Sequence, residues 1–250
     1  MSHDQVEFEL RDGVGWLTIR RPEAKNALTK AMYAAIRDVC RQAWLDDSIL
    51  ALVISGSDGA FVTGGDLKEM LALLESEDQT ALLAYEEFLP FEALRILPKP
   101  TVAVVDGLCM GGGLTLMSLC DIAIATTSSK FAMPEAKVGI VDGHMPRLFR
   151  DRVPSALLRY WLYTGTSFSA AEAYAAGMLT KVVEPEQLTA TTEQVLRELR
   201  ASSPGAISLY KQTLNETRTV SGMQDAFVTM MGEDARARLA AFSERSKSKR

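Results

Sequence analysis

The stretch that decides the fold is VVDGLCMGGGL, residues 104–114. An apolar run ends at Asp106-Gly107, and the three glycines at 111–113 then open an expected helix that runs to about Leu119. The first N–H groups of a helix have no partner within it, and the positive end of the helix dipole lies behind them. The glycines therefore predict either a helix start that holds an anionic oxygen or close packing of this helix on a strand.

A second turn of the same kind is GAFVTGGDLKEM, residues 59–70. The short apolar run from Leu50 to Ser55 precedes it and is expected to be a strand covered on both faces. A helix is expected to follow from Leu67 to Glu75. The paired glycines at 64–65 permit a bend that aims N–H groups outward, or simply a tight loop. For the glycines at 111–113, a dinucleotide site is a further and weaker alternative, because their spacing does not fit GxGxxG.

The rest of the pattern predicts an α/β core followed by a helical C-terminal region. A hairpin is expected at residues 6–19 with Asp12-Gly13 at its turn, and a helix after Leu28 with Thr29 as its N-cap. The other expected elements are a helix at 80–97, strands at 101–105, 121–125 and 180–183, and a capping box at 169–172.

Composition restricts the class of function. Of the 250 residues, 47% are hydrophobic and 24% charged, which is typical of a soluble globular enzyme. The net charge of −5 and the lack of a basic stripe argue against nucleic acid as a partner. No apolar run approaches the length of a membrane span. The only histidines are His3 and His144, so a His-rich metal site is excluded and no metal is expected.

The cysteines and the N-terminus bear on the cellular compartment. Three cysteines lie in apolar stretches: Cys40, Cys109 and Cys120. An odd number in such surroundings predicts buried thiols in a reducing cytoplasm, not a disulfide framework. The first residues show no basic stretch followed by an apolar segment, so no secretion signal is expected.

Together these segments resemble the enoyl-CoA hydratase/isomerase (crotonase) family. The matching stretches are collinear and cover nearly the whole chain: RPEAKNAL (21–28), residues 60–70, DGLCMGGG (106–113), CDIAIA (120–125), FAMPE (131–135) and AAEAYAAGMLTKVV (170–183). The resemblance implies that residues 1–190 form the family's spiral of β-β-α units, and that a helical region at 191–250 mediates trimerisation. A homotrimer or a dimer of trimers is therefore expected.

The resemblance also implies an acyl-CoA thioester as substrate, with coenzyme A as part of that substrate and no separate cofactor. The family's reactions pass through an enolate, whose oxygen is held by two N–H groups; by position these belong to Gly65 and Gly112. Contacts to coenzyme A are implied for six residues: Ala24, Lys25, Gly65, Asp66, Leu67 and Lys68. Lys211, from the C-terminal helices, is a further candidate for a contact to coenzyme A in its own or a neighbouring subunit, with plain solvation as the alternative. Helices within 67–97 are expected to build the acyl pocket.

The family's hydratases use two glutamates, and this sequence keeps one. The first motif position, two residues after the third glycine, is Thr115, whose hydroxyl is no base near neutral pH. The second position follows Pro134 and is Glu135. One base is enough to move a double bond. The resemblance therefore favours an enoyl-CoA isomerase in which Glu135 carries the proton.

A second departure from the hydratase pattern is Asp142, in GIVDGH at 139–144, where many hydratases have a proline. Acids at this place occur in the family's dehalogenases and naphthoate synthases. Asp142 is therefore expected either to face the acyl group, with His144 close by, or to stabilise a turn. Three alternatives to isomerisation stay open: a hydratase that uses Asp142 at an altered water site, a family decarboxylase, and a CoA-thioester-binding protein without activity.

Overall fold

The structure is a computed structural model that describes residues 4–76, 84–215, 236–237, 240–241 and 244. Its strands are β1 (Val6–Arg11), β2 (Val14–Ile19), β3 (Ala51–Gly56), β4 (Ala60–Val62), β5 (Thr101–Val105), β6 (Leu108–Met110), β7 (Ile122–Thr126), β8 (Lys130–Ala132), β9 (Phe168–Ser169) and β10 (Lys181–Val183). They form a six-stranded sheet, β1-β2-β3-β5-β7-β10, and a four-stranded sheet, β4-β6-β8-β9.

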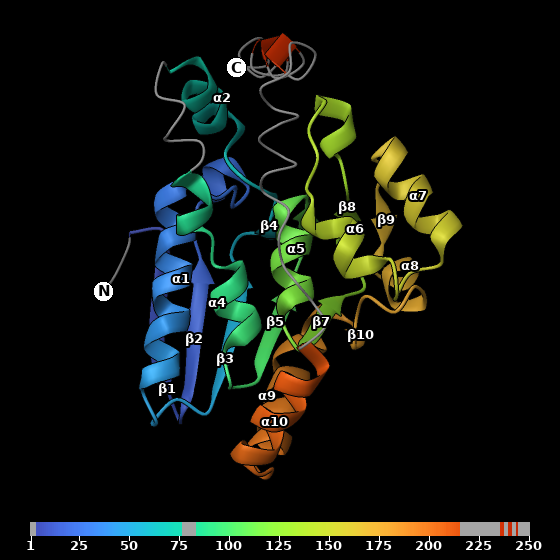
Figure 1. The fold of residues 1–250 in the computed structure, drawn as a ribbon. Coiled ribbons are helices and arrows are strands. Elements are labelled where there is room, and N and C mark those ends of the chain that lie inside the picture. Colours follow the sequence, from blue (N-terminus) through green and yellow to red (C-terminus); the bar gives the residue numbers. More distant parts are fainter. Residues whose placement is uncertain (1–3, 77–83, 216–235, 238–239, 242–243, 245–250) are drawn as a thin grey trace.

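The helices are α1 (Lys30–Leu45), α2 (Leu67–Glu75), α4 (Phe91–Ile96), α5 (Gly112–Leu119), α6 (His144–Phe149), α7 (Ser155–Thr164), α8 (Ala170–Ala175), α9 (Leu188–Arg200) and α10 (Pro204–Asn215), with 3-10 turns η1 (Pro22–Ala24), η2 (Ala84–Phe88), η3 (Glu135–Val138) and η4 (Pro185–Gln187). In chain order, helices come after successive pairs of strands, as α2 does after β3 and β4 and α5 after β5 and β6 (Figure 1). Three successive units each add a strand to the large sheet, a strand to the small sheet and then helix. This order confirms the predicted spiral of β-β-α units.

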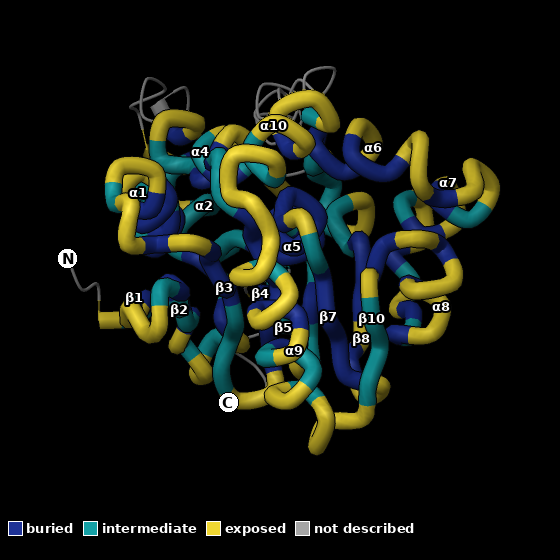
Figure 2. Tube along the Cα trace, turned by 90° about the horizontal axis from the view of Figure 1, so that it is seen from below, coloured by how far each residue is buried: buried dark blue, intermediate teal, exposed yellow. Residues whose placement is uncertain are grey.

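The large sheet is covered on both faces, as the apolar run in β3 predicts. Because strand side chains alternate, Leu52 and Ile54 face the main core beside Met32 of α1. Val53 points to the other face and packs in a second cluster with Leu196 of α9. Figure 2 shows the central strands largely in the buried class. The sheet is therefore held between α1, α4 and α5 on one side and α9 on the other.

Most expected elements are confirmed, including the hairpin, the N-cap at Thr29 and the capping box at Ser169. The continuous helix expected at 80–97 is wrong. Its described part consists of η2 and the separate helix α4, with Pro90 between them. Proline lacks an N–H and its ring clashes with the preceding turn, so the helix begins anew after Pro90. Residues 80–83 lie outside the described part.

The C-terminal region is only partly described. The predicted boundary at residue 190 falls in the first turn of α9, which packs on the large sheet. The stretch from 216 onward lies mostly outside the described residues, so the two-part division and the trimer stay predictions. Within the described part, no helix is long and apolar enough to cross a membrane. The cysteines are buried and free, as predicted: Cys40, Cys109 and Cys120.

Three short strands that the sequence did not predict position the glycine turns. β4 pairs in parallel with β6, and β6 pairs in parallel with β8, so the residues after all three strands leave the sheet at one edge. The N–H of Gly111 donates to the carbonyl of Ala132 at 3.0 Å. A Cβ on Gly113 would lie 2.1 Å from the carbonyl oxygen of Val62, so only glycine permits this approach.

Asn26 ties the N-terminal stretch to the small sheet. It is fully buried, with a left-handed φ of 58°. Its amide nitrogen donates to the carbonyls of Ser57 (3.0 Å) and Ala60 (2.7 Å), and its amide oxygen accepts from the N–H of Arg21 (2.7 Å). One side chain thus satisfies three backbone groups and fixes the entry to β4.

We expect Asn26→Ala to lower the free energy of unfolding by about 2–4 kcal/mol, because it leaves these backbone groups without their partner and places alanine in a left-handed conformation. Chemical denaturation measures the change. Asp58→Ala is the matched control, since Asp58 also has a positive φ (54°) but is exposed. An equal loss in both variants would show that the hydrogen bonds of Asn26 do not stabilise the fold.

Candidate active site

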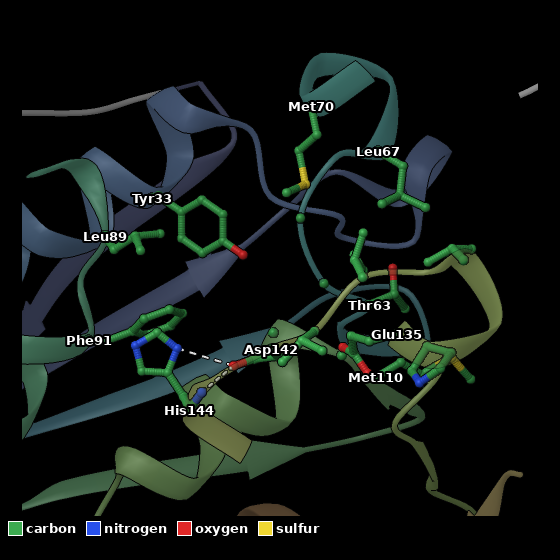
Figure 3. Close-up of a pocket in the computed structure, with 18 of the residues that line it drawn as sticks. Tyr33, Thr63, Leu67, Met70, Leu89, Phe91, Met110, Glu135, Asp142 and His144 are labelled. Carbon is green, nitrogen blue, oxygen red and sulfur yellow. Dashed lines mark hydrogen bonds and ion pairs between the residues drawn. The ribbon is translucent and has the colours of Figure 1, made fainter. Parts of the chain in front are cut away.

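A pocket of about 410 Å³ lies at the edge where β4, β6 and β8 end (Figure 3). Most of its wall is apolar or aromatic, contributed by Tyr33, Leu67, Met70, Tyr85, Leu89, Phe91, Leu108, Met110, Val138, Ile140 and Val141. Its polar side chains are Lys25, Thr63, Glu135, Asp142 and His144. An apolar cleft with a few converging polar groups is typical of a small-molecule site. Helices within 67–97 contribute to this wall, and their expected role as an acyl pocket stays a prediction.

Gly65 and Gly112 lie side by side in the pocket. The N–H of Leu28 donates to the carbonyl of Gly64, and its carbonyl accepts from the N–H of Asp66, both at 2.8 Å. These bonds bracket Gly65, whose own N–H donates to no described residue. Gly112 begins α5, so its N–H has no acceptor within the helix. A Cβ on Gly112 would lie 4.0 Å from the nitrogen of Gly65. Two free donors this close can stabilise one anionic oxygen.

Glu135 enters the pocket directly after β8, as the first residue of η3. Its Oε2 is buried and has no hydrogen-bond partner among the described residues. Its Oε1 lies against Gly111, where a Cβ would come within 2.8 Å. Burial, and then the charge of Asp142, raise the pKa of Glu135 to about 8. At neutral pH this group is therefore mainly protonated and able to donate a proton.

Asp142 is held by hydrogen bonds to both of its oxygens. Thr115 Oγ1 donates to Oδ2 at 2.7 Å, the N–H of His144 donates to Oδ1 at 2.8 Å, and the ring Nδ1 of His144 lies 3.1 Å from Oδ1 (Figure 3). Burial alone would raise the pKa of Asp142, but the bonds from His144 and Thr115 and the attraction of the His144 ring lower it below the ordinary value. Asp142 is therefore ionised in the same pocket in which Glu135 is protonated.

The residues expected to contact coenzyme A fall into two groups. Three line the pocket: Lys25, Gly65 and Leu67. Three do not: Ala24, Asp66 and Lys68. Asp66 instead caps α2, and its Oδ2 lies 2.7 Å from Nη2 of Arg21. The cap and the ion pair therefore hold the turn that carries Gly65 against the start of α2.

Thr115 and Lys211 lie outside the pocket lining. Thr115 is fully buried behind Asp142, so it reaches the site through that carboxylate. The ammonium of Lys211 is buried under α10, where it donates to Oδ2 of Asp121 (2.8 Å) and to the carbonyl of Lys99 (3.0 Å). The expected solvation of Lys211 is wrong, because its ammonium is buried and hydrogen-bonded. Lys211 does not line this pocket, and its contact to coenzyme A of a neighbouring subunit stays a prediction. Lys211 holds α10 to the core.

Sequence reasoning missed Tyr33, which α1 projects into the pocket (Figure 3). It lies on the buried face of α1, and 4% of its surface is exposed. Its neighbours on this face, Met32 and Ile36, are apolar. The available signal was therefore a hydroxyl on a face that otherwise buries only apolar groups, because a buried tyrosine hydroxyl usually has a partner.

Comparisons with known proteins agree with this geometry. Residues 9–247 match the family described as enoyl-CoA hydratase/isomerase. The chain is 32% identical to a crotonyl-CoA hydratase of Syntrophomonas wolfei over 99% of its length and 98% of the relative's. It is 30% identical to a short-chain-enoyl-CoA hydratase of Clostridium acetobutylicum, covering 97% and 91% of the two chains. The solved enoyl-CoA hydratase/isomerase of Pseudoalteromonas atlantica superposes with a TM-score of 0.85 at 26% identity, covering 97% and 98%.

We expect Glu135→Gln to raise the melting temperature, increasingly as the pH rises from about 4.5 to about 8. Because the pKa of Glu135 is raised in the folded state, the neutral acid does not destabilise the fold below its ordinary pKa. The free energy of unfolding then falls as the pH rises from the ordinary pKa through about 8. Glutamine stays neutral throughout. Thermal denaturation over a pH series measures the difference between the two proteins.

Glu172→Gln is the control of opposite sign. Hydrogen bonds from the backbone and side chain of Ser169 lower the pKa of Glu172, so its contribution to stability is present above the ordinary pKa and is lost as the pH falls. A constant difference between Glu135→Gln and the unmodified protein across the whole pH series would contradict a buried acid with a raised pKa.

Proposed function

The chain belongs to the enoyl-CoA hydratase/isomerase (crotonase) family of acyl-CoA enzymes, and we propose that it adds water to the double bond of a 2-enoyl-CoA thioester. The observation that carries the proposal is a pair of pocket carboxyl groups in opposite surroundings: Oε2 of Glu135 is buried with no hydrogen-bond partner among the described residues, whereas Asp142 accepts hydrogen bonds from His144 and Thr115. Burial raises the pKa of Glu135, and the bonds from His144 and Thr115 lower the pKa of Asp142. Two titratable groups whose surroundings separate their pKa values supply an acid and a base at the same pH. The names of the relatives, which are hydratases, support the same reaction.

The thioester oxygen is proposed to accept from the N–H groups of Gly65 and Gly112. Addition to the β-carbon turns the thioester into an enolate, and fixed donors stabilise the charge that develops on its oxygen. Coenzyme A would then extend past Lys25 and Leu67, which line the same pocket as Gly65. The acyl chain would lie against the apolar wall.

Asp142 is proposed to activate the water, and Glu135 to protonate the α-carbon. Asp142 accepts a proton from the water molecule while the oxygen of that water forms a bond to the β-carbon. The π electrons move toward the thioester, and the α-carbon then takes the proton of Glu135. The product is the 3-hydroxyacyl-CoA, and both carboxyl groups recover their first states when the proton passes from Asp142 to Glu135 through solvent. Thr115 and His144 keep Asp142 ionised and in place.

Double-bond isomerisation is the second candidate. It is favoured by Thr115 at the place of the missing glutamate and by the unpartnered Oε2 of Glu135, which is free to take and return a proton. A base must begin the cycle ionised, however, and the raised pKa of Glu135 leaves it mainly protonated at neutral pH. Hydration therefore needs Glu135 protonated at the start of the cycle, whereas isomerisation needs it ionised.

We expect Asp142→Asn and Glu135→Gln each to lower kcat for hydration by about 10²–10⁴-fold, with little change in thioester binding, because each removes a proton-transfer group and keeps the shape. Thr115→Ala should lower it far less, since only one of the bonds to Asp142 is lost. Loss of the enoyl absorbance measures turnover, and mass spectrometry identifies the product. Full turnover in Asp142→Asn, or formation of the 3-enoyl isomer without added water, would contradict the hydratase.

The pH dependence of kcat/KM tests the same assignment independently. Hydration needs protonated Glu135, so the rate should fall as the pH rises through about 8. On the acid side it should persist until Asp142 takes up a proton, below the ordinary pKa of an aspartate. Isomerisation by Glu135 as base predicts the opposite slope, a rate that rises through about 8. Steady-state kinetics from about pH 5 to about pH 10, a range that brackets the pKa of Glu135, distinguish the reactions.

A further inference from the structure

The hydroxyl of Tyr33 faces the two glycines that carry the free N–H groups. A Cβ added to Gly112 would lie 3.0 Å from this hydroxyl oxygen, and one added to Gly65 would lie 3.6 Å from it. Figure 3 shows the ring reaching from α1 with its oxygen toward the middle of the pocket. The hydroxyl therefore lies close to both glycines, in the same pocket as their free N–H groups.

The ring of Tyr33 is fixed, but its hydroxyl is not engaged. Tyr85 and Phe91 pack against the ring in T-shaped contacts, with centroids 6.4 Å and 6.0 Å away. No described residue forms a hydrogen bond with the hydroxyl. Burial, and then repulsion from the acidic groups Tyr85, Asp142, Glu135 and Glu69 when these are ionised, raises the pKa of Tyr33 well above its ordinary value. The group therefore keeps its proton and is available as a donor.

We propose that Tyr33 is a third donor of the oxyanion site, and that its hydroxyl hydrogen-bonds the thioester oxygen as enolate charge develops there. The inference rests on the proposed function, because a thioester oxygen between Gly65 and Gly112 is what the hydroxyl would meet. A purely structural role explains the ring but not the oxygen, since phenylalanine would make the same T-shaped contacts.

The test compares Tyr33→Phe with the unmodified protein and with Tyr160→Phe. Tyr160→Phe also deletes a phenol hydroxyl, but on the exposed surface of α7, 53% exposed. We expect Tyr33→Phe to lower kcat by about 10²-fold, the size of effect seen when one oxyanion donor is removed, with a smaller change in KM. Tyr160→Phe should match the unmodified protein. Thermal denaturation should show that both variants stay folded.

A spectroscopic measurement separates this role from the chemistry of turnover. Crotonyl-CoA labelled with ¹³C at the thioester carbonyl is bound to Glu135→Gln, which is slow, and to Glu135→Gln/Tyr33→Phe. Hydrogen bonds lower the carbonyl stretching frequency, so the infrared band should lie at higher wavenumber in the double variant. An unchanged band, with unchanged kcat in Tyr33→Phe, overturns the third donor and leaves the hydratase proposal standing. Failure of Glu135→Gln to bind the thioester overturns both.

Discussion

The parallel pairing of β4, β6 and β8 governs the geometry of the site. Each strand has three residues, and each is followed by a functional element: the turn with Gly65, the helix start at Gly112, and Glu135. Because the strands pair in parallel, these three elements leave the small sheet at the same edge. The pairing needs glycine at two points: a Cβ on Gly113 would lie 2.1 Å from a carbonyl of β4, and one on Gly107 would lie 1.9 Å from the carbonyl of Gly59. A larger side chain at either point would separate the strands and the donors with them.

This constraint also explains what the sequence could and could not predict. The strands of the large sheet are five or six residues long at its centre and apolar on both faces, so composition and run length predicted them. The strands of the small sheet have only two or three residues, too few for any periodicity, and they are defined by partners far along the chain. The helix expected through Pro90 was wrong because the favourable composition of its neighbours does not offset the missing N–H and the ring of the proline.

The site divides in the same way. Gly65, Gly112 and Glu135 were predicted because each occupies a fixed place in a local motif. The protonation state of Asp142 was left open, since it depends in part on Thr115. Thr115 is 27 residues away in sequence, yet its Oγ1 lies 2.7 Å from Oδ2 of Asp142. Tyr33 was missed for a related reason. Helical periodicity identifies the buried face of α1, but nothing local shows that part of this face borders a cavity and not the packed core.

Thr115 and Asp142 are best understood as one unit. The motif position on α5 that holds an acid in the family's hydratases here holds a hydroxyl, and that hydroxyl donates to a carboxylate supplied by the loop before α6. The pocket therefore keeps one ionised group near Glu135 but takes it from another element. Two ionised carboxylates in contact would repel each other and raise the pKa of at least one. An acid at position 115 and an acid at position 142 are thus alternatives. In the second arrangement, the threonine hydroxyl donates a hydrogen bond to the aspartate and stabilises its charge. After burial, the charge of Asp142 is the second cause that raises the pKa of Glu135. Residue 115 therefore affects the pKa of the proton donor through its bond to Asp142, without contacting Glu135.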